Sequence, residues 1–435
     1  MGRRRARALA FVTVWIALIL DVLPASAASG VSWSSPIQVG AANRTTCDRA
    51  LAATASTSGV ALHAVYKIAD ADSWGGIRLY YRRSRDNGAT WTAPATLTAN
   101  PSVWKECPKI AGAGSLLVAA WRQGTATAAA IRYRVSTDGG TTWRAEGRLP
   151  APRTAGKPSV AVAGSTITIA WTDGSGSERW SRIAMSRDRG GSWTIRALDA
   201  KPTSPDTYSA PTTQVAASGS RTFAAWLRAG GTRLIGRAST DGGLTWQAPT
   251  ILATTFTPVE TPYSAVPGRA QFSIAARPDR MAIAWTGGWA ATPGQPQLFT
   301  RVFADGAWGA PATITASAAA GQHPYGYFAW PAITLLAATR VGVAAVVCED
   351  LREIDLLYGC GEPYGGAFHV LWSESASNGR AWTTPVDVNG GSLTYADYVS
   401  VVWTSASLRG LLVDRADGEP DWDFSLLFYR GSGLP

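Results

Sequence analysis

The sequence predicts an all-β fold, a β-propeller of four-stranded blades, and two observations carry this prediction. An eight-residue motif occurs four times, as "SRDNGATW" (84–91), "STDGGTTW" (136–143), "SRDRGGSW" (186–193) and "STDGGLTW" (239–246), so its closing Trp recurs every 50 to 53 residues. Each repeat also holds four short apolar runs separated by Gly-rich turns, without helical periodicity. Four antiparallel strands per repeat are typical of a propeller blade.

Two later repeats are looser. "RVFADGAW" (301–308) has a shortened turn, and "SASNGRAW" (375–382) has Ser377 in place of the Asp. After the last repeat come three strand-like runs without a fourth, and "WSSPIQVG" (33–40) offers the missing strand. A ring closed in this way leaves no open edge. This count predicts seven blades, or six if one loose repeat is an insertion.

The repeated motif joins the third and fourth strands of each blade. We predict that its Ser and Asp accept hydrogen bonds from turn amides, that its Gly supplies a positive φ, and that its Trp packs beneath. These structural residues are Ser84, Asp86, Gly88, Trp91, Ser136, Asp138, Gly140, Trp143, Ser186, Asp188, Gly190, Trp193, Ser239, Asp241, Gly243 and Trp246. A catalytic role is disfavoured, because four equivalent carboxylates dispersed round a ring cannot converge on one substrate.

Large aromatic residues also recur once per blade, near the ends of the second strands. They are Trp121, Trp171, Trp226 and Trp285, with Tyr66 at the matching place in the first repeat. We predict that they pack between blades, with stacking on sugars as the alternative.

The first residues have the features of a secretory signal. Four Arg lie among residues 3–7, an apolar stretch covers 8–20, and Ala25-Ser26-Ala27 matches an A-x-A cleavage site. We predict a signal peptide at 1–27, a single propeller domain at 28–435 and a secreted protein. The paired arginines leave Sec or twin-arginine export open. No later stretch resembles a membrane span.

The cysteines and the net charge indicate which disulfides, cofactors and ligands to expect. In an exported chain four Cys favour two disulfides, and we predict Cys348–Cys360 and Cys47–Cys107, with unpaired buried thiols as the alternative. We expect no metal and no other cofactor, because C-x-x-C spacing is absent and the three His lie apart. The net charge of +10 comes without a Lys/Arg run after the signal, which disfavours nucleic acid and allows anionic ligands. We expect a monomer.

The repeated turn resembles the Asp-box, or BNR repeat, of the sialidase superfamily, over nearly the whole chain after the signal. The resemblance implies an active site on the rim opposite the Asp-boxes. It also implies three arginines for the substrate carboxylate, an Asp acid/base, and a Tyr nucleophile activated by a Glu. An Arg fork matches a carboxylate, and a neutral Tyr avoids repulsion by an anionic sugar. Because many functions share this repeat, the function must be argued from the site.

Several residues match the pattern of the sialidase superfamily. Tyr395 in "YADY" resembles the nucleophile, with Tyr398 as its competitor. Asp72 lies five residues before a third strand, where the family keeps its acid/base, and Asp70 is the near alternative. Arg228, which ends "TFAAWLR", resembles a substrate arginine.

Other positions depart from the family pattern. Arg49 in "CDRALA" lacks the Ile-Pro that follows the first family arginine, and Lys67 stands where an Arg is usual. Glutamines precede the strand "LFTRVF" where the third arginine is expected, and Arg301 within that strand can point elsewhere. Asp206 in "DTYSAP" is a shorter, displaced substitute for the Glu.

The connections between blades carry a second pattern, which does not depend on the resemblance. Each places Tyr beside polar groups, namely Tyr208, Tyr263 with Glu260, Tyr325 or Tyr327, and Tyr395 or Tyr398. Tyrosines around a rigid ring suit stacking on sugar faces. The sequence thus predicts a secreted sialidase-like propeller that binds or processes extracellular glycan through a degenerate site. The alternatives are an active exo-α-sialidase and a non-catalytic protein-interaction scaffold.

Overall fold

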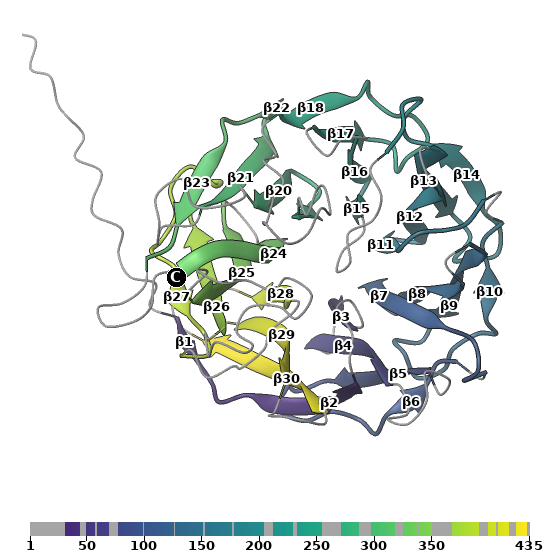
Figure 1. The fold of residues 1–435 in the computed structure, drawn as a ribbon, viewed down its shortest axis with the longest axis horizontal. Helices are drawn as coiled ribbons and strands as arrows, with labels where there is room; N and C mark the ends of the chain where they lie inside the picture. Colours follow the sequence, from purple (N-terminus) through teal and green to yellow (C-terminus); the bar gives the residue numbers. More distant parts are fainter. Residues whose placement is uncertain are drawn as a thin grey trace, which may run out of the picture.

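The chain forms a ring of seven antiparallel sheets (Figure 1). The computed structural model describes residues 31–43, 49–56, 59–68, 77–98, 100–125, 127–150, 153–175, 178–203, 212–228, 233–254, 271–286, 297–317, 325–336, 339–349, 368–390, 399–405, 408–416 and 423–432. No helix in these ranges is long and apolar enough to cross a membrane. The predicted all-β propeller is confirmed, with seven blades rather than six.

The first four blades each have four strands in sequence order. Blade 1 comprises β3 (Arg49–Ser56), β4 (Gly59–Ile68), β5 (Arg78–Ser84) and β6 (Ala95–Thr96). Blade 2 comprises β7 (Lys105–Ala113), β8 (Leu116–Gly124), β9 (Ala129–Ser136) and β10 (Gly147–Arg148). Blade 3 comprises β11 (Ser159–Ala163), β12 (Thr166–Ser175), β13 (Glu178–Ser186) and β14 (Thr194–Ala197). Blade 4 comprises β15 (Thr213–Ser218), β16 (Arg221–Leu227), β17 (Leu234–Ser239) and β18 (Thr250–Ala253).

The last three blades are less regular. Blade 5 comprises β19 (Phe272–Ala276), β20 (Met281–Thr286), β21 (Gln297–Ala304), β22 (Ala307–Trp308) and β23 (Ala312–Thr315). Blade 6 comprises β24 (Tyr325–Leu335), β25 (Val341–Glu349), β26 (Phe368–Ser375) and β27 (Val386–Asp387). Blade 7 comprises β28 (Val399–Ser405), β29 (Leu408–Ala416) and β30 (Asp423–Ser432), completed by β1 (Ser32–Trp33) and β2 (Ile37–Asn43).

The N-terminal strands close the ring as predicted. Ser32 pairs with Ser432, and Ile37 pairs with Phe428, so both ends of the described chain share blade 7. On the inside, β28 of blade 7 lies beside β3 of blade 1. The outer edge of the last blade is therefore covered by the chain's own beginning.

The seven inner strands surround a central cavity of about 210 Å³. Polar side chains on these strands bond to the backbone of the next blade: Ser159 Oγ accepts from Val215 N at 3.1 Å, and Gln214 Nε2 donates to Phe272 O at 2.6 Å. An inner strand has no sheet neighbour on its channel side, so such bonds satisfy backbone groups that would otherwise lack a partner. They also tie neighbouring blades together at the hub.

The Asp-box turns have the predicted hydrogen bonds. In blade 2, Ser136 Oγ donates to Asp138 Oδ1 at 2.8 Å and accepts from Gly140 N at 2.9 Å, while Thr142 N donates to Asp138 Oδ1 at 2.9 Å. The other three intact boxes repeat this arrangement. Hydrogen bonds from the Thr142 side chain and backbone lower the pKa of Asp138 to about 2. Each Asp carboxylate therefore accepts hydrogen bonds within its own turn, as expected of a structural residue.

The Asp-box tryptophans pack against the preceding blade. Trp143 meets Tyr81 edge to face at 5.1 Å between ring centroids, and Trp91 meets Phe428 in the same way at 5.6 Å. Phe428 lies on β30 of blade 7, so this contact crosses the closure of the ring. The turn therefore joins two blades as well as two strands, which the motif alone did not reveal.

The aromatic residues of the second strands belong to the core, as predicted. Trp121, Trp171 and Trp226 are fully buried, and Trp285 and Tyr66 are nearly so. Each lies in an apolar cluster that combines residues of two blades. Their stacking on a sugar is ruled out by this burial.

Blades 5 and 6 depart from the intact box in different ways. The β21–β22 hairpin turns through Asp305 and Gly306, both with positive φ, which is the geometry of a two-residue turn. In blade 6, Ser377 Oγ accepts from Ala381 N at 2.8 Å and so takes over one hydrogen bond of the missing Asp.

The cysteines are only partly described. Cys107 is buried and disulfide-bonded, and the described residues include no free thiol. Cys47 and Cys360 lie outside the described residues, and Cys348 is described by its backbone in β25. The predicted pairings stay predictions.

Candidate functional site

The two rims of the propeller carry different loops. The Asp-box rim holds the turns between third and fourth strands. The site rim, at the other end of every strand, holds the ends of the second strands and the connections between blades. Most sequence-predicted site residues belong to chain segments that the structure does not describe. Asp72, Asp206, Tyr208, Glu260, Tyr263, Tyr395 and Tyr398 lie outside the described residues, and Tyr325 is described by its backbone at the start of β24.

Arg49 and Lys67 occupy the site-rim end of blade 1. Arg49 begins β3 and pairs across the ladder with Tyr66 of β4, and Lys67 follows Tyr66 in the chain. Both side chains are 1% exposed, and Lys67 Nζ lies 5.1 Å from the centroid of the Trp104 ring. A cation above an indole face is stabilised by the ring's quadrupole. This end of blade 1 therefore holds two cations inside the protein.

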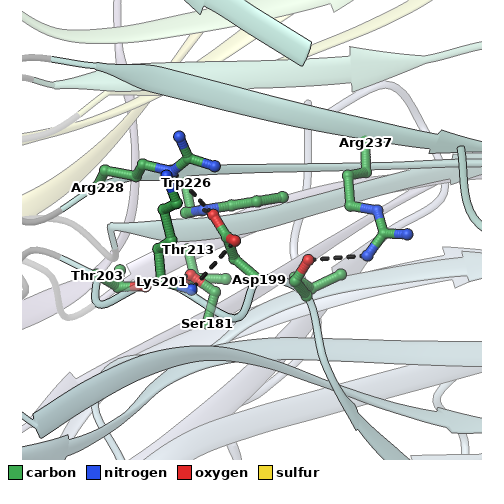
Figure 2. A network of polar contacts seen from close by, with 9 residues as sticks. Ser181, Asp199, Lys201, Thr203, Thr213, Trp226, Arg228 and Arg237 are labelled. Atoms are coloured by element: carbon green, nitrogen blue, oxygen red, sulfur yellow. Dashed lines mark hydrogen bonds and ion pairs between the residues drawn. The ribbon is translucent and has the colours of Figure 1, made fainter. Parts of the chain in front are cut away.

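Arg228 occupies the corresponding end of blade 4, where Asp199 binds it (Figure 2). Asp199 Oδ2 accepts from Arg228 Nε at 2.9 Å and from Trp226 Nε1 at 3.2 Å, and Asp199 Oδ1 accepts from Lys201 N at 3.2 Å. The Asp199 side chain is 6% exposed and that of Arg228 is 18% exposed. Because the Nε bond fixes the guanidinium plane, Asp199 determines the orientation of Arg228.

The backbone that carries Asp199 is held from both sides. Leu198 N donates to Ser181 O of blade 3 at 2.9 Å, while Leu198 O accepts from Arg237 Nη1 of blade 4 at 2.9 Å. Asp199 is thus a bridge between the outer strand of blade 3 and the second strand of blade 4. No repeat motif includes Asp199, so its role could not be predicted from the repeats.

Buried hydroxyl groups form a continuous network behind this bridge. Ser181 Oγ lies 2.8 Å from Thr203 Oγ1 and accepts from Thr213 Oγ1 at 3.0 Å, and Thr172 Oγ1 lies 3.1 Å from Thr213 Oγ1 and 3.0 Å from Thr212 Oγ1. All five side chains are at most 3% exposed. A fully bonded network of this kind fixes the junction of blades 3 and 4.

Two further carboxylate–arginine pairs lie at the same rim. Asp173, at the end of β12, is fully buried, with its Oδ2 3.4 Å from Arg182 Nε. Burial raises the pKa of Asp173, against the lowering by Trp171 and Arg182. In blade 2, Glu106 pairs with Arg122, which also donates to Ala155 O at 2.8 Å. Both pairs join structural elements, and the full burial of Asp173 keeps its carboxylate away from a ligand.

Arg301 does not belong to the site rim. Its Nε donates to Gly309 O at 2.6 Å and its Nη1 donates to Leu252 O of blade 4 at 3.1 Å. Arg237 makes the equivalent bonds to Gln247 O and Leu198 O. Arg301 therefore links the outer strands of neighbouring blades, as Arg237 does. Its side chain bonds to blade 4 and does not point to the site rim.

The described residues contain no group of three His, Cys, Asp or Glu that could hold a metal ion. The two described histidines lie in different blades: His63 in β4 and His369 in β26. His369 Nδ1 lies 2.7 Å from Asp387 Oδ2 of the adjacent outer strand.

Known proteins with this architecture include sialidases. Phage phi92 endosialidase superposes with a TM-score of 0.50 at 10% identity, over 94% of this chain and 70% of that one. A protein of unknown function from Dyadobacter fermentans gives a TM-score of 0.50 at 12% identity, over 93% and 99%. Trypanosoma rangeli sialidase gives 0.47 at 14% identity, and the match spans 60% of its length. No curated protein matches the chain.

The likeness to phage phi92 endosialidase and the Dyadobacter fermentans protein shows the shared fold alone, because identity is low. The repeats give a more direct relationship. Residues 10–255 match the BNR repeat-like domain, and this range contains all four intact Asp-boxes. The chain is therefore a member of the BNR repeat-like family, a sialidase-like propeller.

Proposed function

We propose that this protein is secreted and that its site rim binds or processes an acidic extracellular glycan. The observation that carries the proposal is the set of cationic side chains built into this rim at positions where the resemblance places substrate arginines. Arg49 and Lys67 stand at the end of blade 1, and Arg228 stands at the end of blade 4. The signal-like residues 1–27 support export.

The charge and burial of Arg49 and Lys67 suit an anionic sugar. Both side chains are almost fully buried, so their charges act through protein more than through water. Coulomb attraction is several times stronger in such surroundings than in bulk solvent. Arg49 and Lys67 would therefore attract an anionic sugar through their field, while Arg228, whose side chain is 18% exposed, would contact its carboxylate directly.

The bonding of Arg228 suits the same role. Asp199 anchors it through Nε, and Trp226 and the blade 3–4 hydroxyl network hold Asp199 in turn. A binding group fixed in advance loses less conformational entropy when its ligand arrives. Arg228 would therefore give orientation to a carboxylated ligand as well as charge.

The chemistry would come from residues of the site-rim loops. Tyr395 is the candidate nucleophile, Asp72 the candidate acid/base, and Asp206 the candidate partner that activates the Tyr. Tyr208, Tyr263, Tyr325 and Tyr398, with Glu260, are the candidates for sugar contacts. Lys67 and Asp206 depart from the sialidase pattern. These two departures support glycan binding by a degenerate site over full exo-α-sialidase activity.

An interaction scaffold is the weaker alternative. A protein-docking rim needs a broad apolar patch. Among the described residues, the exposed large hydrophobic side chains are Leu244 and Ile251, and neither lies on the site rim.

The test is hydrolysis of a fluorogenic α-sialoside by the mature protein, together with binding to sialylated and asialo glycans. The variants are Tyr395→Phe, Asp72→Ala and Arg228→Ala, with Asp279→Ala, an exposed carboxylate of the Asp-box rim, as the matched control. Turnover that is lost in Tyr395→Phe and Asp72→Ala but kept in Asp279→Ala would establish glycan processing.

Binding without turnover, weakened by Arg228→Ala, would establish a glycan-binding protein. If the wild type neither cleaves nor binds any sialylated or other acidic glycan, the proposal is wrong and the scaffold alternative gains.

A further inference from the structure

The Asp-box rim of blades 1–3 carries a series of arginines that the proposed function does not use. We call them the arginine arc: Arg83, Arg85, Arg144, Arg187, Arg189 and Arg196. All except Arg83 are exposed to solvent. They lie on the Asp-box turns or on the strands that enter and leave them.

Four of the arc arginines, Arg83, Arg144, Arg187 and Arg196, are held by the turns of the next blade. Arg144 Nη1 donates to Arg189 O at 2.9 Å, and Arg83 Nη1 donates to Gly139 O at 2.6 Å. At the junction of blades 3 and 4 there are two such bonds: Arg187 Nη2 donates to Gly242 O at 3.1 Å, and Arg196 Nη1 donates to Leu244 O at 2.9 Å. A guanidinium has five N–H groups, so one bond of this kind positions it without exhausting its donors.

A cavity lies where these two bonds converge. It measures about 130 Å³ and lies between the Asp-box turns of blades 3 and 4. Arg187 and Arg196 both line it with the hydroxyl-bearing Ser192 and Thr194, and the remaining lining is Gly243 and the apolar Ile183, Met185 and Leu244. Its size suits a single charged group, such as a sulfate or a carboxylate, rather than a large side chain.

The carboxylates near the cavity bind their own turns and not the arc arginines. The nearest box carboxylates are Asp188 and Asp241, and both are committed to their own turns. Asp188 Oδ1 accepts from Ser192 N at 2.9 Å, and Asp241 Oδ1 accepts from Thr245 N at 3.0 Å. Within the described part of the chain, no ion pair joins an arc arginine to a carboxylate. Asp188 and Asp241 keep their negative charge, but neither is paired with an arc arginine in the described residues, so the guanidinium groups keep N–H donors for an anionic ligand.

We propose that the arginine arc is a second binding site, which holds the sulfate or carboxylate groups of an acidic polysaccharide, with the cavity at Arg187 and Arg196 as its principal subsite. Guanidinium groups repeated along several blades match a ligand whose anionic groups repeat along a chain. This site is on the rim opposite to Arg49 and Arg228. It does not depend on the function proposed for the site rim.

The surroundings favour a polysaccharide over a nucleic acid. Single-stranded nucleic acids are bound largely by stacking of bases on aromatic side chains. The aromatic residues nearest to the arc are the box tryptophans, and Trp193 packs against Tyr133 of blade 2 while Trp246 packs in the cluster of blades 3 and 4. Neither is presented as a platform for bases.

The experiment measures the affinity of the mature protein for fluorescent heparin at low and moderate salt. The test variant is Arg187→Ala with Arg196→Ala, and the matched control is Arg148→Ala, an exposed arginine on β10 outside the arc. We expect Kd to rise about tenfold or more in the double variant and to change less than about twofold in the control. The same two positions changed to Lys should recover part of the affinity, because charge returns without the planar fork.

Three outcomes would overturn the proposal. The first is unchanged heparin affinity in the double Ala variant. The second is a DNA oligonucleotide that binds as tightly as heparin and depends on the same arginines. The third is loss of heparin binding in Arg228→Ala, since this would place the polyanion on the site rim. Retained heparin binding in Arg228→Ala, with sialoglycan binding lost, separates the two sites.

Discussion

Gly140 lies directly against the phenol ring of Tyr81, which belongs to the preceding blade. A Cβ atom at this glycine would overlap the Tyr81 hydroxyl, and Gly140 also has a φ of 80°. The same relationship recurs in the other boxes, at Gly88 against Phe428, Gly190 against Val135, and Gly243 against Met185. The Asp-box glycine is therefore needed both for its turn and for the contact between blades.

We expect Gly140→Ala to destabilise the protein by about 3 kcal/mol, from positive-φ strain together with displacement of Tyr81. Gly139→Ala is the matched control, because Gly139 has a φ of 68° but nothing within 4 Å of its Cβ position. It should cost about 1 kcal/mol. Urea unfolding of the two variants measures the difference, and equal costs would show that the contact between blades contributes nothing.

His63 predicts a pH dependence of stability. It is fully buried between Thr54 Oγ1 at 2.8 Å and Tyr81 Oη at 2.7 Å, and burial, with Arg83 and Arg85 nearby, lowers its pKa from 6.5 to about 4. The unfolded chain takes up this proton near pH 6.5 and the folded chain only near pH 4. Stability should therefore fall by about 3 kcal/mol as the pH drops through this window.

The check is the free energy of unfolding of wild type and His63→Gln between pH 7 and pH 4. The variant lacks the titrating group, so its stability should fall less steeply over this range. Parallel curves would mean that other groups cause the acid sensitivity.

Arg280 joins blade 5 to blade 6, where blade 5 has no Asp-box. Its side chain is buried, its Nη1 donates to Asn378 Oδ1 at 3.0 Å, and its Nη2 donates to Arg340 O at 3.0 Å. We expect Arg280→Ala to cost about 3 kcal/mol, because it leaves buried acceptors without a charged donor. Arg277→Ala, in the same hairpin, should cost about 0.5 kcal/mol or less. Thermal unfolding compares them, and a similar loss in both would contradict a specific role for Arg280.

Asp199 should act on ligand binding through Arg228. Asp199→Asn keeps the shape of the side chain but offers Arg228 Nε a weaker, neutral acceptor. We expect affinity for a sialylated ligand to fall about tenfold. If turnover occurs, KM should rise more than kcat falls, because a positioning residue does not touch the reacting atoms. Asp305→Asn, on the other rim, should leave both values unchanged; an equal effect there would point to a general structural change.

The sequence could predict the position of a candidate site residue only where the repeats define that position within the blade. Arg228 and Arg49 could be placed at strand ends because strand-like runs in each repeat mark those ends and the resemblance to sialidases implies arginines there. Asp199 could not, because it follows a fourth strand of variable sequence and its partner Trp226 is 27 residues away in the chain. Arg301 shows the same limit: it lies in a predicted strand, but its bond to Leu252 O of the neighbouring blade decides its direction.

The sequence by itself determined the four-stranded blade, the closure by the N-terminal strand and the internal bonding of each Asp-box, and it left seven or six blades open. These features depend on local turn chemistry and on a regular period, and both can be read along one chain. Only the tertiary structure decided which groups meet between blades: Gly140 with Tyr81, Asp199 with Arg228, and Arg187 and Arg196 around one cavity. Such contacts join residues of neighbouring repeats, and their geometry depends on how two complete blades pack against each other.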